Sequence, residues 1–193
     1  MPIPTPTIFT PISMKAINLP AYAKINLILR ILAKRRDGFH TLNTVLQTID
    51  LHDELTFEFE PAKSFEIHLK LSDPKIPADE SNLIHRACIA FHKIHPLKHS
   101  VKIKVIKRIP IQSGLGGGSS NAAATLIALS RLHDWPIPMK DLHQIAGMLG
   151  SDVPFFLKGG TALGTLKGDK IRKLDDWPGS NLLLVIPDVS CST

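Results

Sequence analysis

The segment 114–121, with the sequence GLGGGSSN, constrains this chain more than any other part of its sequence. Residues 101–109 precede it and alternate between apolar and polar types, which predicts a strand with one buried face. Residues 122–132 follow it and are apolar on nearly every side, which predicts a buried helix. Glycines let a backbone approach an anion closely, and the helix offers free N–H groups and the positive end of its dipole. The segment therefore predicts a phosphate-binding loop. A flexible loop with Ser119 or Ser120 as a helix cap is the open alternative.

The residues of the loop exclude two common phosphate-binding motifs. A Walker A loop requires lysine directly after its last glycine, and Ser119 stands there. The dinucleotide fingerprint requires glycine or alanine at that same position. The loop therefore has no lysine of its own. Phosphate charge must then be met by the helix terminus, by Mg²⁺ and by a lysine from elsewhere in the chain.

A second alternating run, residues 21–33, supplies a candidate for that lysine. Its odd positions are apolar and predict a face in the core, whereas Lys24 and Asn26 lie side by side on the other face. Asp152 follows a helix-ending glycine, Gly150, and is the candidate acid–base group. Both candidates also have ordinary interpretations, namely a solvated lysine and an aspartate in a turn or cap.

The remaining sequence predicts strands and helices without strict βαβ alternation, which is an α+β pattern. Residues 55–60 and 65–71 are expected to pair as two strands, and residues 182–186 are expected to form a further strand. A helix is predicted from Ser81 or Asn82 to about Lys93. Another is predicted over 139–149, with a buried stripe formed by Leu142, Ile145, Ala146 and Leu149.

Composition and charge limit the classes of function. The 193 residues contain two cysteines, Cys88 and Cys191, too few for a disulfide framework, so we expect a reducing compartment such as the cytoplasm. No apolar run is long enough to span a membrane, and no membrane partner is expected. The formal net charge of +6 suits an anionic partner without choosing one. Residues 1–13 are proline-rich and are expected to be a disordered extension, with Met14 as an alternative start.

Two further clusters have ordinary interpretations. His92, His95 and His99 lie close together, but no cysteine or acidic residue has ligand spacing to them, so no metal site is predicted. The basic residues of the run 101–109 suit nucleic acid. However, only 6% of residues are aromatic and none alternates with that stripe, so a solvated face is favoured and no nucleic-acid partner is expected.

Four segments together resemble the GHMP kinases, a family of ATP-dependent small-molecule kinases. Residues 110–123, PIQSGLGGGSSNAA, resemble the ATP-binding motif of the family. Residues 21–27 (AYAKINL), 36–40 (RDGFH) and 149–156 (LGSDVPFF) resemble the branch that phosphorylates 4-diphosphocytidyl-2-C-methyl-D-erythritol. The segments occur in the order and spacing of that branch, and the resemblance covers residues 14–193.

The resemblance implies a ribosomal-protein-S5-domain-2-like amino-terminal fold. It also implies transfer of the γ-phosphoryl group of ATP, with Mg²⁺, to the 2-hydroxyl of that substrate, in a bacterial cytosol or a plastid. In this scheme Asp152 takes the proton of the hydroxyl, and Lys24 holds the hydroxyl and stabilises charge. Asn26 contacts the substrate, His40 bonds the cytosine edge and Phe39 stacks on its ring. The implied ATP site consists of Asn82, Lys107, Pro110, Gly114, Leu115, Gly116, Gly117, Gly118, Ser119 and Ser120.

Several features depart from the family pattern. Phe39 stands where tyrosine is usual, which retains the ring but removes a hydroxyl, and Gln112 and Ser113 replace smaller residues at the loop entrance. Complete members continue into a second domain with a third glycine-rich motif, so we expect the carboxy-terminal domain to be largely missing here. The sequence thus leaves two alternatives to an active kinase: a nucleotide-binding fragment without activity, and a nucleic-acid-binding module on the same fold.

Overall fold

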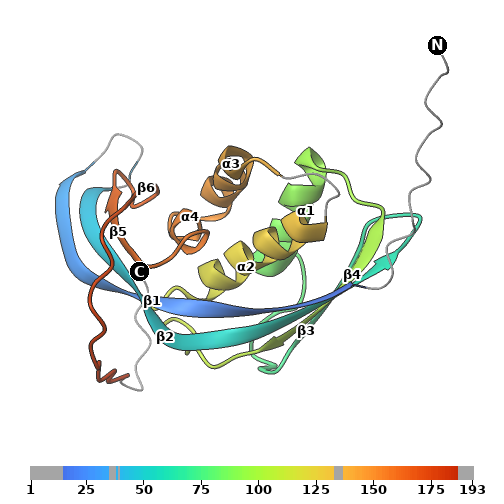
Figure 1. Cartoon of the computed structure of the whole chain (residues 1–193), viewed down its shortest axis with the longest axis horizontal. Coiled ribbons are helices and arrows are strands. Elements are labelled where there is room, and N and C mark those ends of the chain that lie inside the picture. Colours follow the sequence, from blue (N-terminus) through green and yellow to red (C-terminus); the bar gives the residue numbers. More distant parts are fainter. Residues whose placement is uncertain (1–14, 35–37, 39, 133–136, 187–193) are drawn as a thin grey trace, which may run out of the picture.

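The computed structural model describes residues 15–34, 38, 40–132 and 137–186 as one sheet with helices packed on one of its faces (Figure 1). The predicted α+β class is confirmed. No helix within these ranges has the length and apolar character needed to cross a membrane. In chain order the elements are β1 (Lys15–Lys34), β2 (His40–Pro61), β3 (Glu66–Leu71), α1 (Leu83–Ile94), β4 (His99–Ile106), α2 (Gly117–Leu132), α3 (Met139–Leu149), α4 (Val153–Phe156), β5 (Thr161–Thr165) and β6 (Lys170–Lys173).

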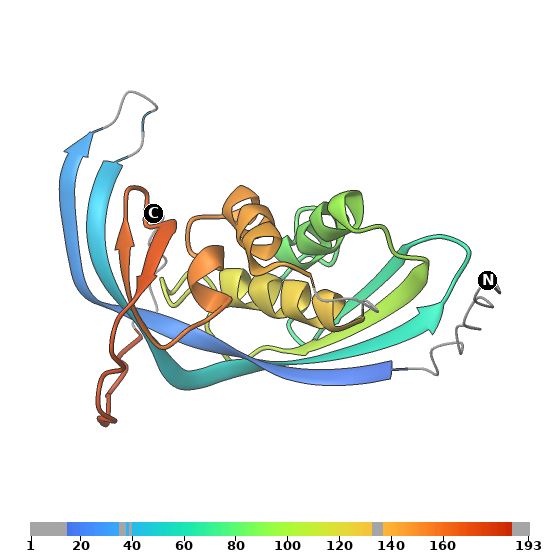
Figure 2. The same ribbon diagram turned by 45° about the horizontal axis from the view of Figure 1, so that its top comes forward.

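The long strand β2 organises the sheet. On one edge it pairs antiparallel with β1 along most of its length. On the other edge its second half pairs with β4 and its first half with β5, which gives the order β3-β4-β2-β5-β6. The β1–β2 hairpin end curls toward the side on which the helices lie (Figure 2). The sheet thus has a helix-covered end, at β3 and β4, and a curled end, at β5 and β6.

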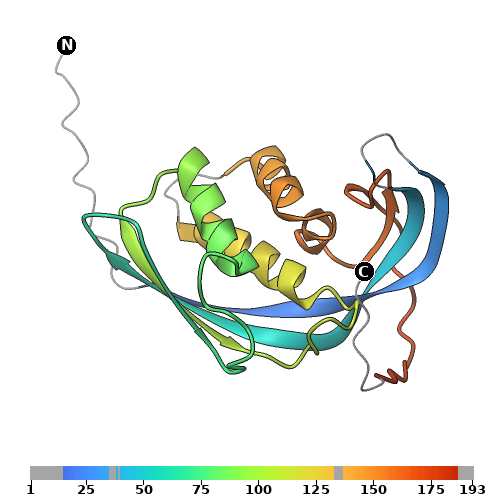
Figure 3. The same cartoon turned by 180° about the vertical axis from the view of Figure 1, so that it is seen from behind.

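The core lies between the helices and the β2–β4 half of the sheet, as the view from behind also shows (Figure 3). Where β2 pairs with β4, alternate residues of both strands are buried against the helices: Leu55, Phe57 and Phe59, and Val101, Ile103 and Val105. The helix α2 is buried on nearly all sides, as its apolar sequence predicts. The predicted stripe of α3 is confirmed, because Leu142, Ile145, Ala146 and Leu149 are its buried residues.

Two expectations about strands are wrong. Residues 55–60 and 65–71 do not pair, because β4 lies between β2 and β3 and runs parallel to β3. Parallel neighbours require a crossover, which α1 supplies between β3 and β4. Residues 182–186 form no strand, and their side chains are exposed although they are large and aliphatic. Alternation identifies a strand but does not identify its neighbour.

The apolar face predicted for residues 21–33 is only partly buried. Ala21 and Ala23 are buried, whereas Leu29 and Ile31 are more than half exposed. The register between β1 and β2 shifts at three places, and the hairpin end extends beyond the part of the sheet that the helices cover. The alternation of apolar and polar residues in β1 therefore continues into a part of the sheet that none of the described helices covers.

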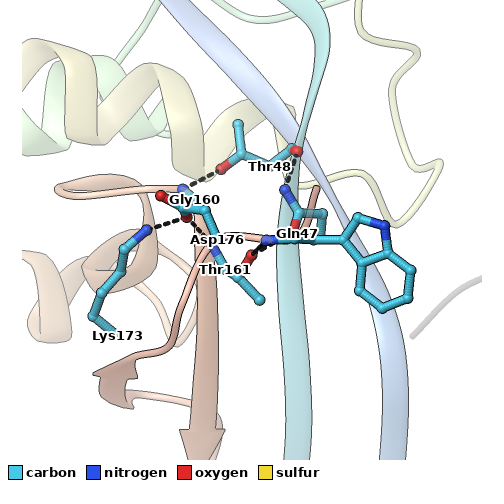
Figure 4. A network of polar contacts seen from close by, with 7 residues as sticks. Gln47, Thr48, Gly160, Thr161, Lys173 and Asp176 are labelled. Atoms are coloured by element: carbon cyan, nitrogen blue, oxygen red, sulfur yellow. Dashed lines mark hydrogen bonds and ion pairs between the residues drawn. The ribbon is translucent and has the colours of Figure 1, made fainter. Parts of the chain in front are cut away.

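The segment that follows β6 is tied back onto β2 by polar contacts (Figure 4). Asp176 pairs with Lys173 and accepts the backbone N–H of Thr161 at 3.1 Å, and these two hydrogen bonds lower the pKa of the Asp176 carboxyl. The Thr161 hydroxyl donates to Gln47 Oε1 at 2.6 Å and accepts the N–H of Trp177 at 2.9 Å. The chain after β6 is therefore held against the curled half of the sheet.

Asn82 caps α1, and its removal tests the helix boundary. Its Oδ1 accepts the N–H of Ile84 at 2.9 Å, and its Nδ2 donates to the carbonyl of Pro77 at 2.7 Å. We expect Asn82→Ala to lower the free energy of unfolding by about 1 kcal/mol in urea denaturation. Asn82→Asp keeps the capping oxygen and should lose less. Identical midpoints for Asn82→Ala and the unchanged chain would contradict this role.

Candidate active site

Gly116 lies where the glycine loop meets β1 and α4. Its φ is +75°, and a Cβ added there would be 2.8 Å from the ring of Phe156 and 3.2 Å from Cγ of Lys24. The first distance is shorter than real Cβ contacts allow, so this position requires glycine. The carbonyl of Gly116 accepts the N–H of Ser120 at 2.9 Å, and α2 begins at Gly117. Ser119 and Ser120 therefore lie inside the first turn, and the proposed serine cap is wrong.

The loop is docked on β1 through its backbone. The N–H of Lys24 donates to the carbonyl of Leu115 at 2.9 Å. The side chain of Leu115 is buried with Ala23 and Ile109 in a small apolar cluster. These contacts fix the glycine loop directly beside Lys24.

The side chain of Lys24 is buried, with 8% of its surface exposed. Its ammonium donates to Asn26 Oδ1 at 2.7 Å and lies 3.6 Å from Asp152 Oδ2. The register shift between Tyr22 and Ala23 interrupts the alternation at this point, so Lys24 is buried as well as Ala23. The interpretation of Lys24 as a solvated surface lysine is therefore wrong, whereas its position beside Asn26 is confirmed.

Asp152 stands at the N-cap position of α4 but makes no side-chain capping hydrogen bond. Its side chain is 38% exposed, and its carboxylate lies near the Lys24 ammonium. Asp152 therefore occupies a cap position, as one interpretation predicted, but its side chain does not cap the helix. The carboxylate is left open both to Lys24 and to a molecule approaching from solvent.

A buried hydroxyl orients Asn26. Asn26 Nδ2 donates to Thr44 Oγ1 at 2.6 Å, and the Thr44 hydroxyl donates to the carbonyl of Ile28 at 2.9 Å. Because the Thr44 hydroxyl donates its hydrogen to that carbonyl, its oxygen accepts a hydrogen bond from the Asn26 amide N–H. The amide oxygen of Asn26 therefore faces Lys24. Thr44 is almost fully buried. Sequence reasoning missed it, since a threonine in a strand carries no signal of this kind.

A second lysine lies near the start of α2. The Lys107 ammonium is 3.3 Å from the point where Gly117 would carry a Cβ, and it pairs with the fully buried carboxylate of Asp53. The structure thus brings Lys107 to the glycine loop, where the sequence placed it. Asp53 was missed. A charged residue that continues the buried series Leu55, Phe57 and Phe59 by one step is the signal that marks it.

The nucleotide-site residues around the loop differ in what surrounds them. A Cβ on Gly118 would lie 3.6 Å from Leu83, so α1 begins beside the first turn of α2. The amide of Asn82, however, is engaged at both ends in capping α1. At the loop entrance Ser113 donates to the carbonyl of Pro110 at 2.7 Å, and Gln112 and Gly114 both have positive φ.

Of the two residues expected at the cytosine, the structure describes only His40, and it lies away from Lys24. Phe39 is outside the described residues, as are Arg36 and Asp37. His40 is exposed at the start of β2, opposite Lys34. Lys24 lies opposite Thr48, eight residues further along β2, an arc of about 26 Å along a strand. The structure thus brings Lys24, Asn26 and Asp152 together and leaves His40 at the curled hairpin end.

The other two clusters have partners nearby. His92 Nδ1 accepts the N–H of Leu97 at 3.0 Å, and its ring stacks on Phe65. Within the described ranges, no group of three histidine, cysteine, aspartate or glutamate residues gathers as a metal site would require. On the basic strand Lys102 pairs with Glu60 at 2.8 Å. Just beyond that strand, the Arg108 guanidinium pairs with the Glu54 carboxylate at 2.8 Å.

Comparison with known proteins shows which family the sequence and the fold resemble. Residues 82–160 match the family model of the GHMP kinases N terminal domain. The chain is 45% identical over 177 residues to the 4-diphosphocytidyl-2-C-methyl-D-erythritol kinase of Caldanaerobacter subterraneus subsp. tengcongensis, which covers 92% of this chain and 60% of that protein. A crystal structure of 4-(cytidine 5'-diphospho)-2C-methyl-D-erythritol kinase has a TM-score of 0.69 at 36% identity, covering 82% of this chain and 55% of that one. The mevalonate kinase of Methanococcus jannaschii, with a TM-score of 0.60 at 17% identity over 86% of this chain and 57% of that one, shares the fold.

The fold and the glycine loop resemble those of the amino-terminal domain of GHMP kinases, the family whose model residues 82–160 match. Within that class, the sequence is related to the 4-diphosphocytidyl-2-C-methyl-D-erythritol kinases, at 37–45% identity. The chain spans about 60% of the length of the curated relatives it matches.

Thr44→Val tests the orientation of Asn26. Valine keeps the shape of threonine but removes both the acceptor for Asn26 and the donor to the Ile28 carbonyl. We expect the free energy of unfolding to fall by about 1 kcal/mol, and the side-chain amide protons of Asn26 to exchange faster with solvent in NMR spectra. Thr44→Ser, which keeps the hydroxyl, is the control. Unchanged amide exchange in Thr44→Val would contradict the orienting contact.

Proposed function

We propose that this chain carries the ATP site and the catalytic pair of an enzyme that phosphorylates the 2-hydroxyl of 4-diphosphocytidyl-2-C-methyl-D-erythritol, a step in the non-mevalonate route to isoprenoid precursors. One observation carries the proposal: the side chain of Lys24 passes directly beside the glycine loop, and its ammonium is held between Asn26 and Asp152. The names of the related proteins supply the substrate. Its compartment, a bacterial cytosol or a plastid, belongs to the proposal as well.

The phosphates of ATP bind at the first turn of α2 in this proposal. The N–H groups of Gly117 and Gly118 have no helical acceptor before them, and they stand at the positive end of the α2 dipole. Glycine at 116 lets the loop pack closely against Lys24 and Phe156. The free N–H groups at the first turn can then receive a phosphate beside Lys24.

Asp152 and Lys24 act at the substrate hydroxyl. The hydroxyl oxygen forms a bond to the γ-phosphorus, the bond from that phosphorus to the β-phosphate oxygen breaks, and ADP leaves. The hydroxyl proton passes to the Asp152 carboxylate, which is exposed enough for an alcohol to reach it. Lys24 stabilises the charge that spreads over the transferred group, and Asn26 together with Thr44 holds the ammonium in place.

Mg²⁺ enters this scheme with the nucleotide. The carboxylate in the site, Asp152, and the phosphate oxygens are the hard oxygen donors that this ion prefers. Held by these oxygens, the ion would neutralise phosphate charge. The residues of this chain orient the substrate hydroxyl through Lys24 and receive its proton at Asp152.

The cytosine end of the substrate is assigned to the hairpin end. His40 is exposed there and Phe39 precedes it in sequence. The hairpin end, where β2 begins at His40, curls toward the helix side of the sheet (Figure 2). An elongated substrate can in this way contact both ends of the curled half of the sheet.

The two alternatives make different use of the same site. A fragment that binds nucleotide without turnover is motivated by the share of the related kinases that the chain spans. A nucleic-acid-binding module is motivated by the basic strand β4, but acidic neighbours already neutralise Lys102 and Arg108. That pairing leaves less positive charge for a phosphate backbone than the sequence suggested.

Release of ADP from Mg·ATP and 4-diphosphocytidyl-2-C-methyl-D-erythritol tests the proposal. We expect substrate-dependent release by the 193-residue chain, lowered about 10²–10⁴-fold in Asp152→Asn because the proton acceptor is lost. Asp141→Asn, which changes an aspartate on α3 paired with His95, is the matched control and should leave turnover unchanged. Equal turnover in Asp152→Asn would refute the assigned base. Binding of Mg·ATP without ADP release would support the fragment alternative.

A further inference from the structure

Asp53 and Lys107 face each other on the helix side of the sheet. The antiparallel ladder between β2 and β4 ends at the pair Glu54 and Ile106, and one further step places Asp53 opposite Lys107. Each residue continues the buried alternate positions of its strand, which are otherwise apolar on both strands. A charged pair therefore takes the place of the next apolar pair in the core-facing rows.

The Asp53 carboxylate binds the segment that leads from β4 into the glycine loop. Oδ2 accepts from the Lys107 ammonium, and Oδ1 accepts the backbone N–H of Arg108 at 2.7 Å and of Ile109 at 2.9 Å. The side chain of Asp53 has no exposed surface. Burying a carboxylate costs free energy, which these three donors offset only while the segment keeps this conformation.

The other end of the pair lies at the phosphate loop. The Lys107 ammonium is 3.3 Å from the position of a Cβ on Gly117, the first residue of α2, and its side chain is 8% exposed. A lysine ammonium has three N–H donors, and the bond to Asp53 uses one. The remaining donors lie within reach of an anion at the first turn of α2.

We propose that Asp53 is a positioning residue of the phosphate site: it holds the Lys107 ammonium beside the first turn of α2 and fixes the backbone that enters the glycine loop. A loop without a lysine of its own thus receives one from the strand before it. The inference rests on the proposed function, because it concerns the same ATP site.

Substituting Asp53 distinguishes positioning from simple charge. A carboxylate near bound phosphates repels them, so charge alone would make Asp53→Asn bind ATP more tightly. If Asp53 instead positions Lys107, the substitution changes the affinity for ATP in the opposite direction. In Asp53→Asn the side-chain amide would keep an oxygen for Arg108 and Ile109, but it would no longer hold the ammonium of Lys107, and ATP would bind more weakly.

Calorimetric titration of the full chain with Mg·ATP tests the inference. We expect Asp53→Asn and Lys107→Met each to raise the Kd about tenfold. The double variant should be no weaker than Lys107→Met alone, because the two residues act through one ammonium. Glu54→Gln is the matched control: it breaks the exposed pair with Arg108, one residue along β2, and should leave the Kd unchanged.

Each outcome bears on the inference. An unchanged or lower Kd in Asp53→Asn, even with a lower melting temperature, would overturn it, and so would additive losses in the double variant. If Asp53→Asn does not fold, Lys107→Met decides, because an unchanged Kd there refutes the role of the ammonium. A parent chain that is folded but binds no Mg·ATP would refute the phosphate site itself, and this inference with it.

Discussion

The close approach of three elements at Gly116 is the constraint on which the rest of the site depends. A side chain at this residue would occupy the space of the Phe156 ring and press on Lys24. Without it, the loop lies against β1 closely enough for the Lys24 N–H to bond the Leu115 carbonyl. The same approach brings α4, and with it Asp152, to the ammonium of Lys24. One missing Cβ thus allows a strand, a loop and a helix to present their polar groups at one point.

The two ends of the sheet differ in what they bury. Under the helices, alternate positions of β2 and β4 are apolar and form the core. Where β4 leaves the sheet, buried charged and polar groups appear among the apolar ones, with Asp53 and Thr44 on β2 and Lys24 on β1. Each of these groups has a partner of opposite charge or a hydrogen bond, as burial requires. The polar end is held in place by the apolar end, to which it is joined through the same continuous strands.

The sequence predicted what depends on local pattern. The helix 139–149, its buried stripe, the glycine loop before a buried helix and the adjacency of Lys24 and Asn26 all follow from periodicity and from glycine chemistry. It did not predict that β4 separates β2 from β3, because alternation carries no information about which strand is the neighbour. It left open whether Lys24 is solvated, because alternation alone does not show that Lys24 is buried together with Ala23. Thr44 acts through residues that are distant in the chain, so only the fold reveals it, whereas Asp53 is marked only by its place in the alternation of β2.

The affinity of Gly116→Ala for Mg·ATP tests the central claim most directly. We expect the Kd of this variant to rise at least about tenfold, because an alanine there is strained by its positive φ and displaces Phe156 and Lys24. Gly147→Ala is the matched control, since a Cβ at that position of α3 meets open space, and it should bind as the parent chain does. Equal affinity in both variants would contradict the claim that the close approach at Gly116 forms the nucleotide site.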